Sequence, residues 1–106
     1  MKVEENFSVI EQYLCIVMPK EVDHHNAEGI SRTADEMICH ENVTSIIFDF
    51  EQTEFMDSSG IGIIVGRYKK IICFGGKVYA IHTSQQIRKI LHMSGLQRLI
   101  EIVEEN

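Results

Sequence analysis

The chain has 106 residues, of which 44% are hydrophobic and 25% are charged. This composition is typical of one globular domain and argues against disorder. With 16 acidic residues against 10 basic ones, the net charge is −6. An acidic chain is a poor match for nucleic acid or an anionic membrane surface, whereas it would attract a basic protein. We therefore expect neither nucleic acid nor a membrane among its partners.

The three cysteines, Cys15, Cys39 and Cys73, lie far apart in apolar stretches. Their odd number argues against a disulfide framework and favours a reducing compartment. The N-terminal sequence Met1-Lys2-Val3-Glu4-Glu5 does not resemble a signal peptide, and we expect none. There is no C-x-x-C motif or Cys/His cluster typical of zinc. We expect a cytoplasmic protein, monomeric on its own, that holds no metal or cofactor.

The first half of the chain predicts two strands, a helix and a third strand. Residues 7–11 and 13–18 are rich in aliphatic and aromatic side chains, and their short link favours antiparallel pairing. Helical spacing predicts a helix over 25–40, capped by Asp23 or Asn26. The third strand, 43–50, contains an Ile-Ile-Phe run, so we expect burial on both of its faces.

The second predicted helix follows a loop over 51–57. It begins at Ser58 or Ser59, and Gly75-Gly76 ends it near residue 74. Helical spacing predicts a core stripe on this helix made of Ile61, Ile64, Val65, Tyr68, Ile71 and Ile72.

A fourth strand over 77–81, a short helix from the capping Ser84 to residue 93, and a fifth strand over 99–103 complete the pattern. Strands that alternate with helices indicate an α/β domain. We predict a mainly parallel sheet of about five strands, with an antiparallel N-terminal pair and three to four helices.

The segment Asp57-Ser58-Ser59-Gly60-Ile61-Gly62 opens the second helix. The carboxyl edge of a parallel sheet is where such folds place their sites. The first turn of a helix has unpaired N–H groups and a positive dipole end, which accommodate phosphate. Two hydroxyls at this point are compatible with a phosphorylation switch. The structural alternative is that Ser58 or Ser59 is only the N-cap, which is the more common role of a serine at this position.

Three other chemistries have weaker support in the sequence. The glycines at 60, 62 and 66 miss the dinucleotide-binding spacing by one residue, and there is no P-loop. Ser58 lacks a G-x-S-x-G elbow, although the chain has histidines that a catalytic triad would need. His24 and His25 are adjacent, so we expect them to point in different directions and to make a poor metal site.

The second helix carries two glycines four residues apart, Gly62 and Gly66, which lie on one side. Each glycine inside a helix lowers its stability by about 1 kcal/mol relative to alanine, so the presence of two glycines requires an explanation. One explanation is tight packing of the helix against the sheet. The other is a flat strip that a partner can approach. Ile63, Arg67 and Lys70 lie near this strip and off the predicted core stripe, so they are candidates for a protein contact.

Several motifs, in this order, carry a resemblance to a known family: Glu21-Val22-Asp23-His24-His25, Phe55-Met56-Asp57-Ser58-Ser59-Gly60-Ile61-Gly62, Gly66-Arg67-Tyr68-Lys69, Gly75-Gly76 and Met93-Ser94-Gly95-Leu96. The chain resembles the STAS-domain anti-sigma factor antagonists of spore-forming bacteria over essentially its whole length. The resemblance implies one STAS domain over residues 1–106. It also implies a regulatory protein with no enzymatic activity of its own.

The resemblance further implies a partner switch. The unphosphorylated antagonist binds an anti-sigma factor that is also a serine kinase, which frees the sigma factor for sporulation transcription. The kinase uses ATP to phosphorylate the serine after the aspartate, here Ser58, and a serine phosphatase resets the protein. The family motifs place Asp23, Asp57, Ser59 and Gly60 around this serine. To these, the helix face adds the predicted contacts Gly62, Ile63, Gly66 and Arg67. The alternative is a STAS module that binds a small molecule or nucleotide.

Overall fold

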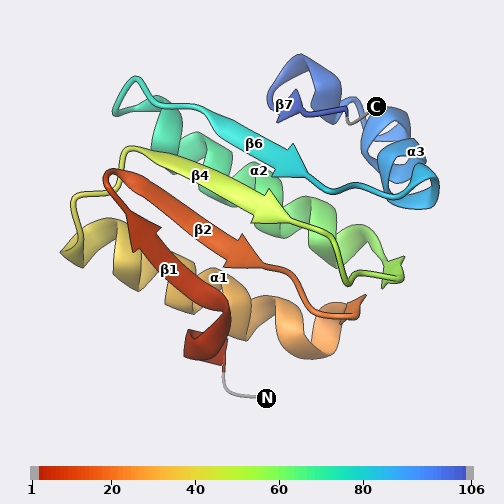
Figure 1. Ribbon diagram of the computed structural model, residues 1–106, viewed down its shortest axis with the longest axis horizontal. Coiled ribbons are helices and arrows are strands. Elements are labelled where there is room, and N and C mark those ends of the chain that lie inside the picture. The colour runs from red at the N-terminus through yellow and green to blue at the C-terminus, as the bar shows by residue number, and fades with distance from the viewer. Residues whose placement is uncertain (1–2, 105–106) are drawn as a thin grey trace.

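The computed structural model describes residues 3–104 and contains a five-stranded sheet (Figure 1). In order across the sheet, the strands are β1 (Phe7–Ile10), β2 (Tyr13–Val17), β4 (Ser45–Asp49), β6 (Val78–Ile81) and β7 (Glu101–Ile102). β1 and β2 are antiparallel, and all other neighbouring pairs are parallel. The predicted α/β class and antiparallel first pair are confirmed, although the strands are shorter than predicted.

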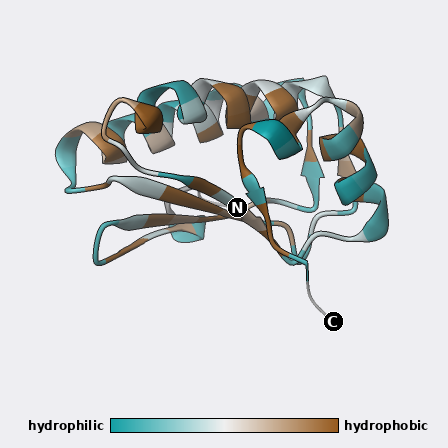
Figure 2. Cartoon of the chain, turned by 90° about the horizontal axis from the view of Figure 1, so that it is seen from above, coloured by the Kyte–Doolittle hydropathy of each residue, from teal (hydrophilic) through white to brown (hydrophobic). Residues whose placement is uncertain are grey.

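Two long helices, α1 (His24–His40) and α2 (Ser58–Ile72), lie side by side on one face of the sheet (Figure 2). A third, α3 (Gln85–Met93), lies at the end of the molecule that carries β7. Its N-cap is Ser84, as predicted. Two short 3₁₀ segments, η1 (Val3–Asn6) and η2 (Leu96–Arg98), were not predicted, because a single turn leaves no periodic pattern. No helix in the described part of the chain is long and apolar enough to cross a membrane.

The central strands are buried on one face only. The side chains turned toward the helices are buried, among them Leu14, Ile16, Ile46, Phe48, Val78 and Ala80. Their neighbours Cys15, Ile47 and Tyr79 point the other way and are half-buried. The prediction that residues 43–50 are buried on both faces is therefore wrong. The reason is that both long helices lie on the same side of the sheet.

A second, two-stranded sheet was not predicted from the sequence. β3 (Glu21–Val22) pairs in parallel with β5 (Phe55–Met56), which lies in the segment predicted to be a loop. Two residues are too few to show an alternating pattern. Because α1 follows β3 and α2 follows β5 within two residues, this pairing brings the first turns of both helices together.

The buried face of α2 is turned by about one position from the predicted stripe. Its buried residues are Gly60, Ile63, Ile64, Arg67 and Ile71. Ile72, assigned to the core from the sequence, is 53% exposed. Isoleucines and valine cover so much of this helix that spacing alone does not locate the centre of the stripe. Gly60 and Arg67 also lie on the buried face, and neither residue type marks a core position in the sequence.

Candidate functional site

Asp57 is the N-cap of α2, and the helix begins at Ser58. The Asp57 backbone is extended, and its Oδ1 accepts a hydrogen bond from the Ser59 N–H at 2.7 Å. The interpretation of Ser58 or Ser59 as the N-cap is therefore wrong. Aspartate caps helices as well as serine does, so the residue before the two serines takes that role. Neither hydroxyl is needed to cap the helix.

Asp23 caps α1 in the same way. Its Oδ1 accepts hydrogen bonds from the His25 N–H at 2.9 Å and the Asn26 N–H at 3.3 Å. The Asn26 side chain in turn accepts from the Asp23 N–H at 3.1 Å, which completes a capping box. Both residues proposed as caps take part, and the helix begins one residue earlier than predicted, at His24.

The two capped helix ends lie next to each other. In the β3–β5 register, Val22 is opposite Met56, and the Asp57 N–H donates to the Val22 carbonyl at 3.0 Å. Asp23 and Asp57 are thus the next residues of two paired segments. Two positive helix ends and two carboxylates meet at this edge of the molecule.

Ser58 is exposed at the first position of α2, whereas Ser59 is half-buried. Gly60 is buried, and a Cβ atom there would collide with the Met56 side chain, so the turn is packed tightly from below. Phe55, just before the site, is 48% exposed. Sequence reasoning did not assign it a role, because a two-residue strand has no alternating pattern that would show its ring facing outward.

The two glycines farther along α2 form an open strip. Gly62 is exposed and Gly66 is half-buried, and a Cβ atom at either position would meet nothing within 4 Å. Tight packing therefore does not explain these glycines. A surface that a partner can approach closely is the interpretation that fits the geometry.

Ile63 and Arg67 do not flank that strip, contrary to the sequence prediction. Ile63 is only 1% exposed and lies in the core. The Arg67 side chain is buried in ionic contact with α1, its Nε 3.0 Å from Asp35 Oδ1. The Lys70 Nζ approaches the other oxygen of Asp35 at 3.5 Å. Arg67 therefore ties α2 to α1 instead of facing solvent.

His24 and His25 do not point apart as expected. Their ring centroids are 4.0 Å apart, and both side chains are exposed. Among the side chains that the structure describes, no third metal-ligating group joins them. A triad through Ser58 has no support either: the histidine that pairs with a carboxylate in the described chain is His82, with Asp49.

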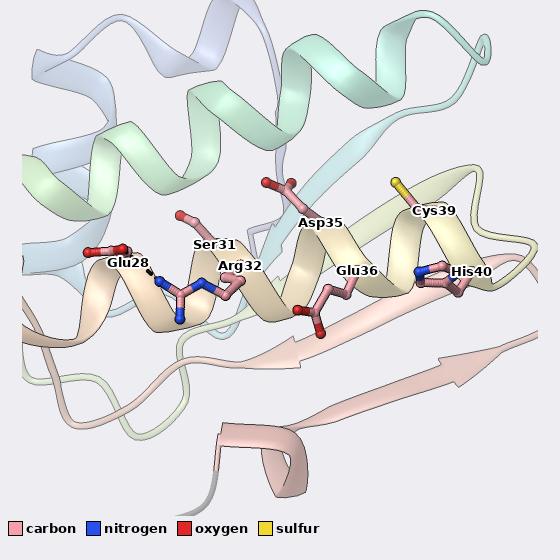
Figure 3. Close-up of a pocket in the computed structure, with 7 residues that line it drawn as sticks. All are labelled: Glu28, Ser31, Arg32, Asp35, Glu36, Cys39 and His40. Carbon is pink, nitrogen blue, oxygen red and sulfur yellow. Dashed lines mark hydrogen bonds and ion pairs between the residues drawn. The ribbon is translucent and has the colours of Figure 1, made fainter.

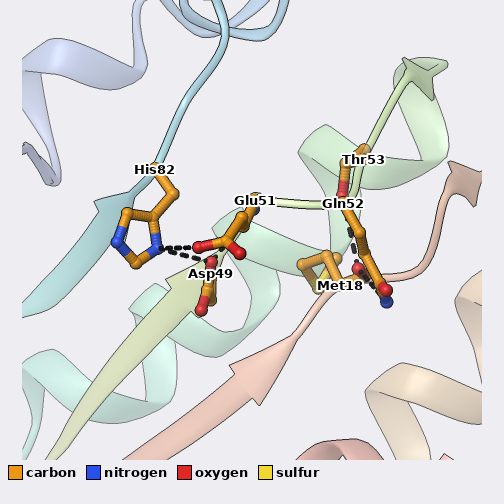
Figure 4. A network of polar contacts seen from close by, with 6 residues as sticks. All are labelled: Met18, Asp49, Glu51, Gln52, Thr53 and His82. Carbon is orange, nitrogen blue, oxygen red and sulfur yellow. Dashed lines mark hydrogen bonds and ion pairs between the residues drawn. The ribbon is translucent and has the colours of Figure 1, made fainter.

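His82, Asp49 and Glu51 form a polar cluster that sequence reasoning missed (Figure 4). Asp49 ends β4, Glu51 follows in the next turn, and His82 comes directly after β6. The residues are far apart in sequence, and only the pairing of β4 with β6 brings them together.

Two surface hollows lie away from Ser58. One, of about 410 Å³, is open and runs along the outer face of α1 (Figure 3), where it is lined by Glu28, Ser31, Arg32, Asp35, Glu36, Cys39 and His40. The other, of about 100 Å³, is lined by Asn6, Phe7, Ile16, Val17, Pro19, Asn26 and Ile30. Neither includes a residue of the segment 57–66, so neither matches the nucleotide site considered for its glycines.

A two-layer α/β fold with paired helix starts at one edge is the architecture of a known family. The model of the STAS domain matches residues 3–105, and the chain therefore belongs to the STAS-domain family. Its sequence is 33% identical over 91 residues to an anti-sigma F factor antagonist of Paenibacillus polymyxa, a match that covers 86% of this chain and 78% of the relative.

Solved structures of SpoIIAA, stage II sporulation protein AA, are similar as well. The unphosphorylated anti-sigma factor antagonist SpoIIAA superposes with a TM-score of 0.83 at 31% identity, covering 93% of this chain and 87% of that one. The phosphorylated Bacillus SpoIIAA has a TM-score of 0.73 at 32% identity, covering 93% and 92%. The family resemblance read from the sequence is confirmed.

Proposed function

We propose that this protein is an anti-sigma factor antagonist that works by partner switching, with Ser58 as the phosphorylated residue. One observation carries the proposal. Ser58 is exposed at the start of α2, while Asp57 does the capping that the serine would otherwise do. The existence of both phosphorylated and unphosphorylated structures of the similar protein SpoIIAA supports it.

In its unphosphorylated form, the protein binds an anti-sigma factor that is also a serine kinase, and so releases a sigma factor for sporulation transcription. A serine phosphatase reverses the modification. This cycle takes place in the cytoplasm, and the protein itself catalyses no reaction. The contact surface consists of the two helix starts and the glycine strip: Asp23, Phe55, Asp57, Ser58, Ser59, Gly60, Gly62 and Gly66.

Phosphorylation would act through charge. A phosphate adds about −1.5 to −2 charges at neutral pH. In the free protein, solvent and the α2 N-terminus accommodate this charge, although the Asp57 carboxylate repels it. In the complex, the charge would be buried against a surface formed for a neutral hydroxyl. An uncompensated buried charge costs ~3–4 kcal/mol, a weakening of several-hundred-fold.

The test is the intact mass after incubation with the partner kinase and ATP. The parent protein should gain one phosphate, and Ser58→Ala should gain none. Ser59→Ala is the matched control, because it removes the neighbouring hydroxyl and should still be modified. The assignment would be contradicted if Ser58→Ala gained a phosphate. It would also be contradicted if an active kinase left both the parent and Ser59→Ala unmodified.

Binding to the kinase gives a second test. Ser58→Ala should bind persistently, because it keeps the neutral surface and cannot be modified. Ser58→Asp should bind much more weakly. If Ser58→Asp bound as tightly as the parent, the charge mechanism would be wrong. The alternative of a small-molecule STAS module predicts a thermal shift with free nucleotide, which we do not expect for a partner switch.

A further inference from the structure

We propose that Asp49, Glu51 and His82 form a binding site for a divalent zinc-type cation, separate from the edge that carries Ser58. This inference does not depend on the proposed function. It rests on the geometry of three side chains at the carboxyl ends of β4 and β6 (Figure 4).

The donor atoms already have the spacing of ligands around one ion. The His82 Nδ1 lies 2.9 Å from Asp49 Oδ1 and 3.6 Å from Glu51 Oε2, and all three ligand atoms fall within 4.8 Å of one another. Metal–ligand bonds of about 2.0–2.1 Å place neighbouring donors roughly 2.8–3.4 Å apart in octahedral or tetrahedral sites. The first observed distance lies within this range and the second just above it, so small side-chain rotations would admit an ion.

The backbone fixes two of the three ligands. β4 and β6 are parallel neighbours, with Asp49 opposite Ile81, so His82 emerges beside Asp49. The Glu51 N–H donates to Asp49 Oδ1 at 3.0 Å, which turns the chain so that Glu51 returns to the same point. Gln52 and Thr53 then bind the Met18 carbonyl at 3.1 and 3.3 Å and anchor the turn. Asp49 and His82 are therefore held side by side before any ion arrives, whereas the exposed Glu51 side chain completes the set from the solvent side.

The donor chemistry selects the ion. Mg²⁺ and Ca²⁺ prefer sites made entirely of oxygen ligands, whereas one imidazole nitrogen with two carboxylates suits Zn²⁺. Two carboxylates neutralise the charge of a divalent ion, and the net charge of −6 favours its approach. Three protein ligands leave a fourth position for water.

The experiment is a calorimetric titration of the intact protein with Zn²⁺, repeated with Mg²⁺ and Ca²⁺. The main variant is His82→Asn, because His82 has a φ of 55° and asparagine tolerates this left-handed backbone. Asp49→Asn is the second variant, and circular dichroism verifies that both fold. The matched control is His92→Asn, which removes an exposed histidine on α3.

We expect one Zn²⁺ per chain in the parent and the control, and binding at least about tenfold weaker in His82→Asn and Asp49→Asn. If the parent binds no Zn²⁺, or if both variants titrate like the parent, the proposal is overturned. In the second case the ion would lie on other groups, such as the exposed thiols of Cys39 and Cys73. Equal affinity for Mg²⁺ or Ca²⁺ would overturn the zinc assignment.

Discussion

At the scale of single residues, Asp57 caps α2, a task that would otherwise fall to Ser58 or Ser59. Its carboxylate satisfies the Ser59 N–H, so α2 starts without help from either serine hydroxyl. Ser58 therefore stays exposed at a position where a change of its charge does not remove a cap. Capping and the proposed phosphorylation therefore depend on adjacent but different side chains.

Asp57→Ala should destabilise the protein by about 0.5–2 kcal/mol, because the first turn of α2 loses its capping acceptor. Asp57→Asn should cost much less, since asparagine caps equally well. Urea unfolding of the three proteins measures the difference. Identical midpoints for the alanine and asparagine variants would show that the cap contributes nothing.

Cys15 has a titration property that follows from its position on β2. Burial raises the pKa of its thiol, the Asp49 carboxylate adds to the rise, and a hydrogen bond with Ser8 partly opposes it. The fold thus favours the neutral thiol. This contribution to stability is fully present below the pKa of the unfolded chain and is lost as the pH rises through the higher pKa of the folded one.

Alkylation of Cys15 by iodoacetamide should accordingly require a higher pH in the folded protein than in the urea-unfolded chain, because only the thiolate reacts. Peptide mass mapping over a pH series follows this one residue in both states. Coincident pH profiles for the folded and unfolded chains would contradict the raised pKa.

At the scale of elements, α2 combines two kinds of glycine. Gly60 is buried and packed on Met56, whereas Gly62 is exposed with nothing near its missing side chain. The first glycine serves the approach of α2 to β5. The second lowers the stability of the helix and gains no closer packing in exchange. Its effect is to leave the surface of α2 open at this position.

Alanine substitutions at Gly60 and Gly62 should change the free energy of unfolding in opposite directions. Gly62→Ala should stabilise the protein by about 0.5–1 kcal/mol, because alanine favours the helix and meets no atom. Gly60→Ala should destabilise it by roughly 1–3 kcal/mol through the clash with Met56. Chemical denaturation measures both variants. A loss of stability in Gly62→Ala would mean that the strip is packed and not open.

At the scale of the whole molecule, the helices and the sheet form two layers (Figure 2), and the start of α2 lies at an exposed edge of this arrangement. A charge at Ser58 therefore does not enter the core, and a switch at this position requires no rearrangement of the layers. In the proposed mechanism, phosphorylation changes which partner the surface can bind and leaves the fold intact.

Ser58→Asp should therefore keep the parent's fold. Its amide NMR spectrum should differ only around the starts of α1 and α2, and its melting temperature should change little, because the α2 dipole favours the new charge while Asp57 opposes it. Shifts spread across β1, β6 or α3 would indicate a conformational switch and contradict the local mechanism.

The order of the main elements could be predicted from the sequence, because apolar runs mark the longer strands, helical spacing marks the helices, and capping residues and glycines mark the helix ends. The β3–β5 pair could not, because two-residue strands have no period. The family motifs had placed Asp23 and Asp57 together around Ser58, but the strand pairing that holds them there was not predicted. The motif at Ser58 could be recognised because all of its residues are consecutive in the sequence.

Features that depend on distant partners were wrong or missed. Arg67 was assigned to the surface because charge usually marks an exposed face, and only Asp35 on another helix explains its burial. The Asp49, Glu51 and His82 cluster has no local pattern, since the parallel pairing of β4 and β6 creates it. Side-chain roles set by tertiary contacts are not encoded in spacing along one element.

The pairing of β3 with β5 also sets when, during synthesis, the proposed contact surface can exist. Its two halves belong to segments far apart in the chain, because β3 precedes α1 and β5 follows β4. A nascent chain that has emerged only through α1 lacks β5 and α2 altogether. Any partner that reads both helix starts at once will therefore recognise finished molecules and pass over partly made ones.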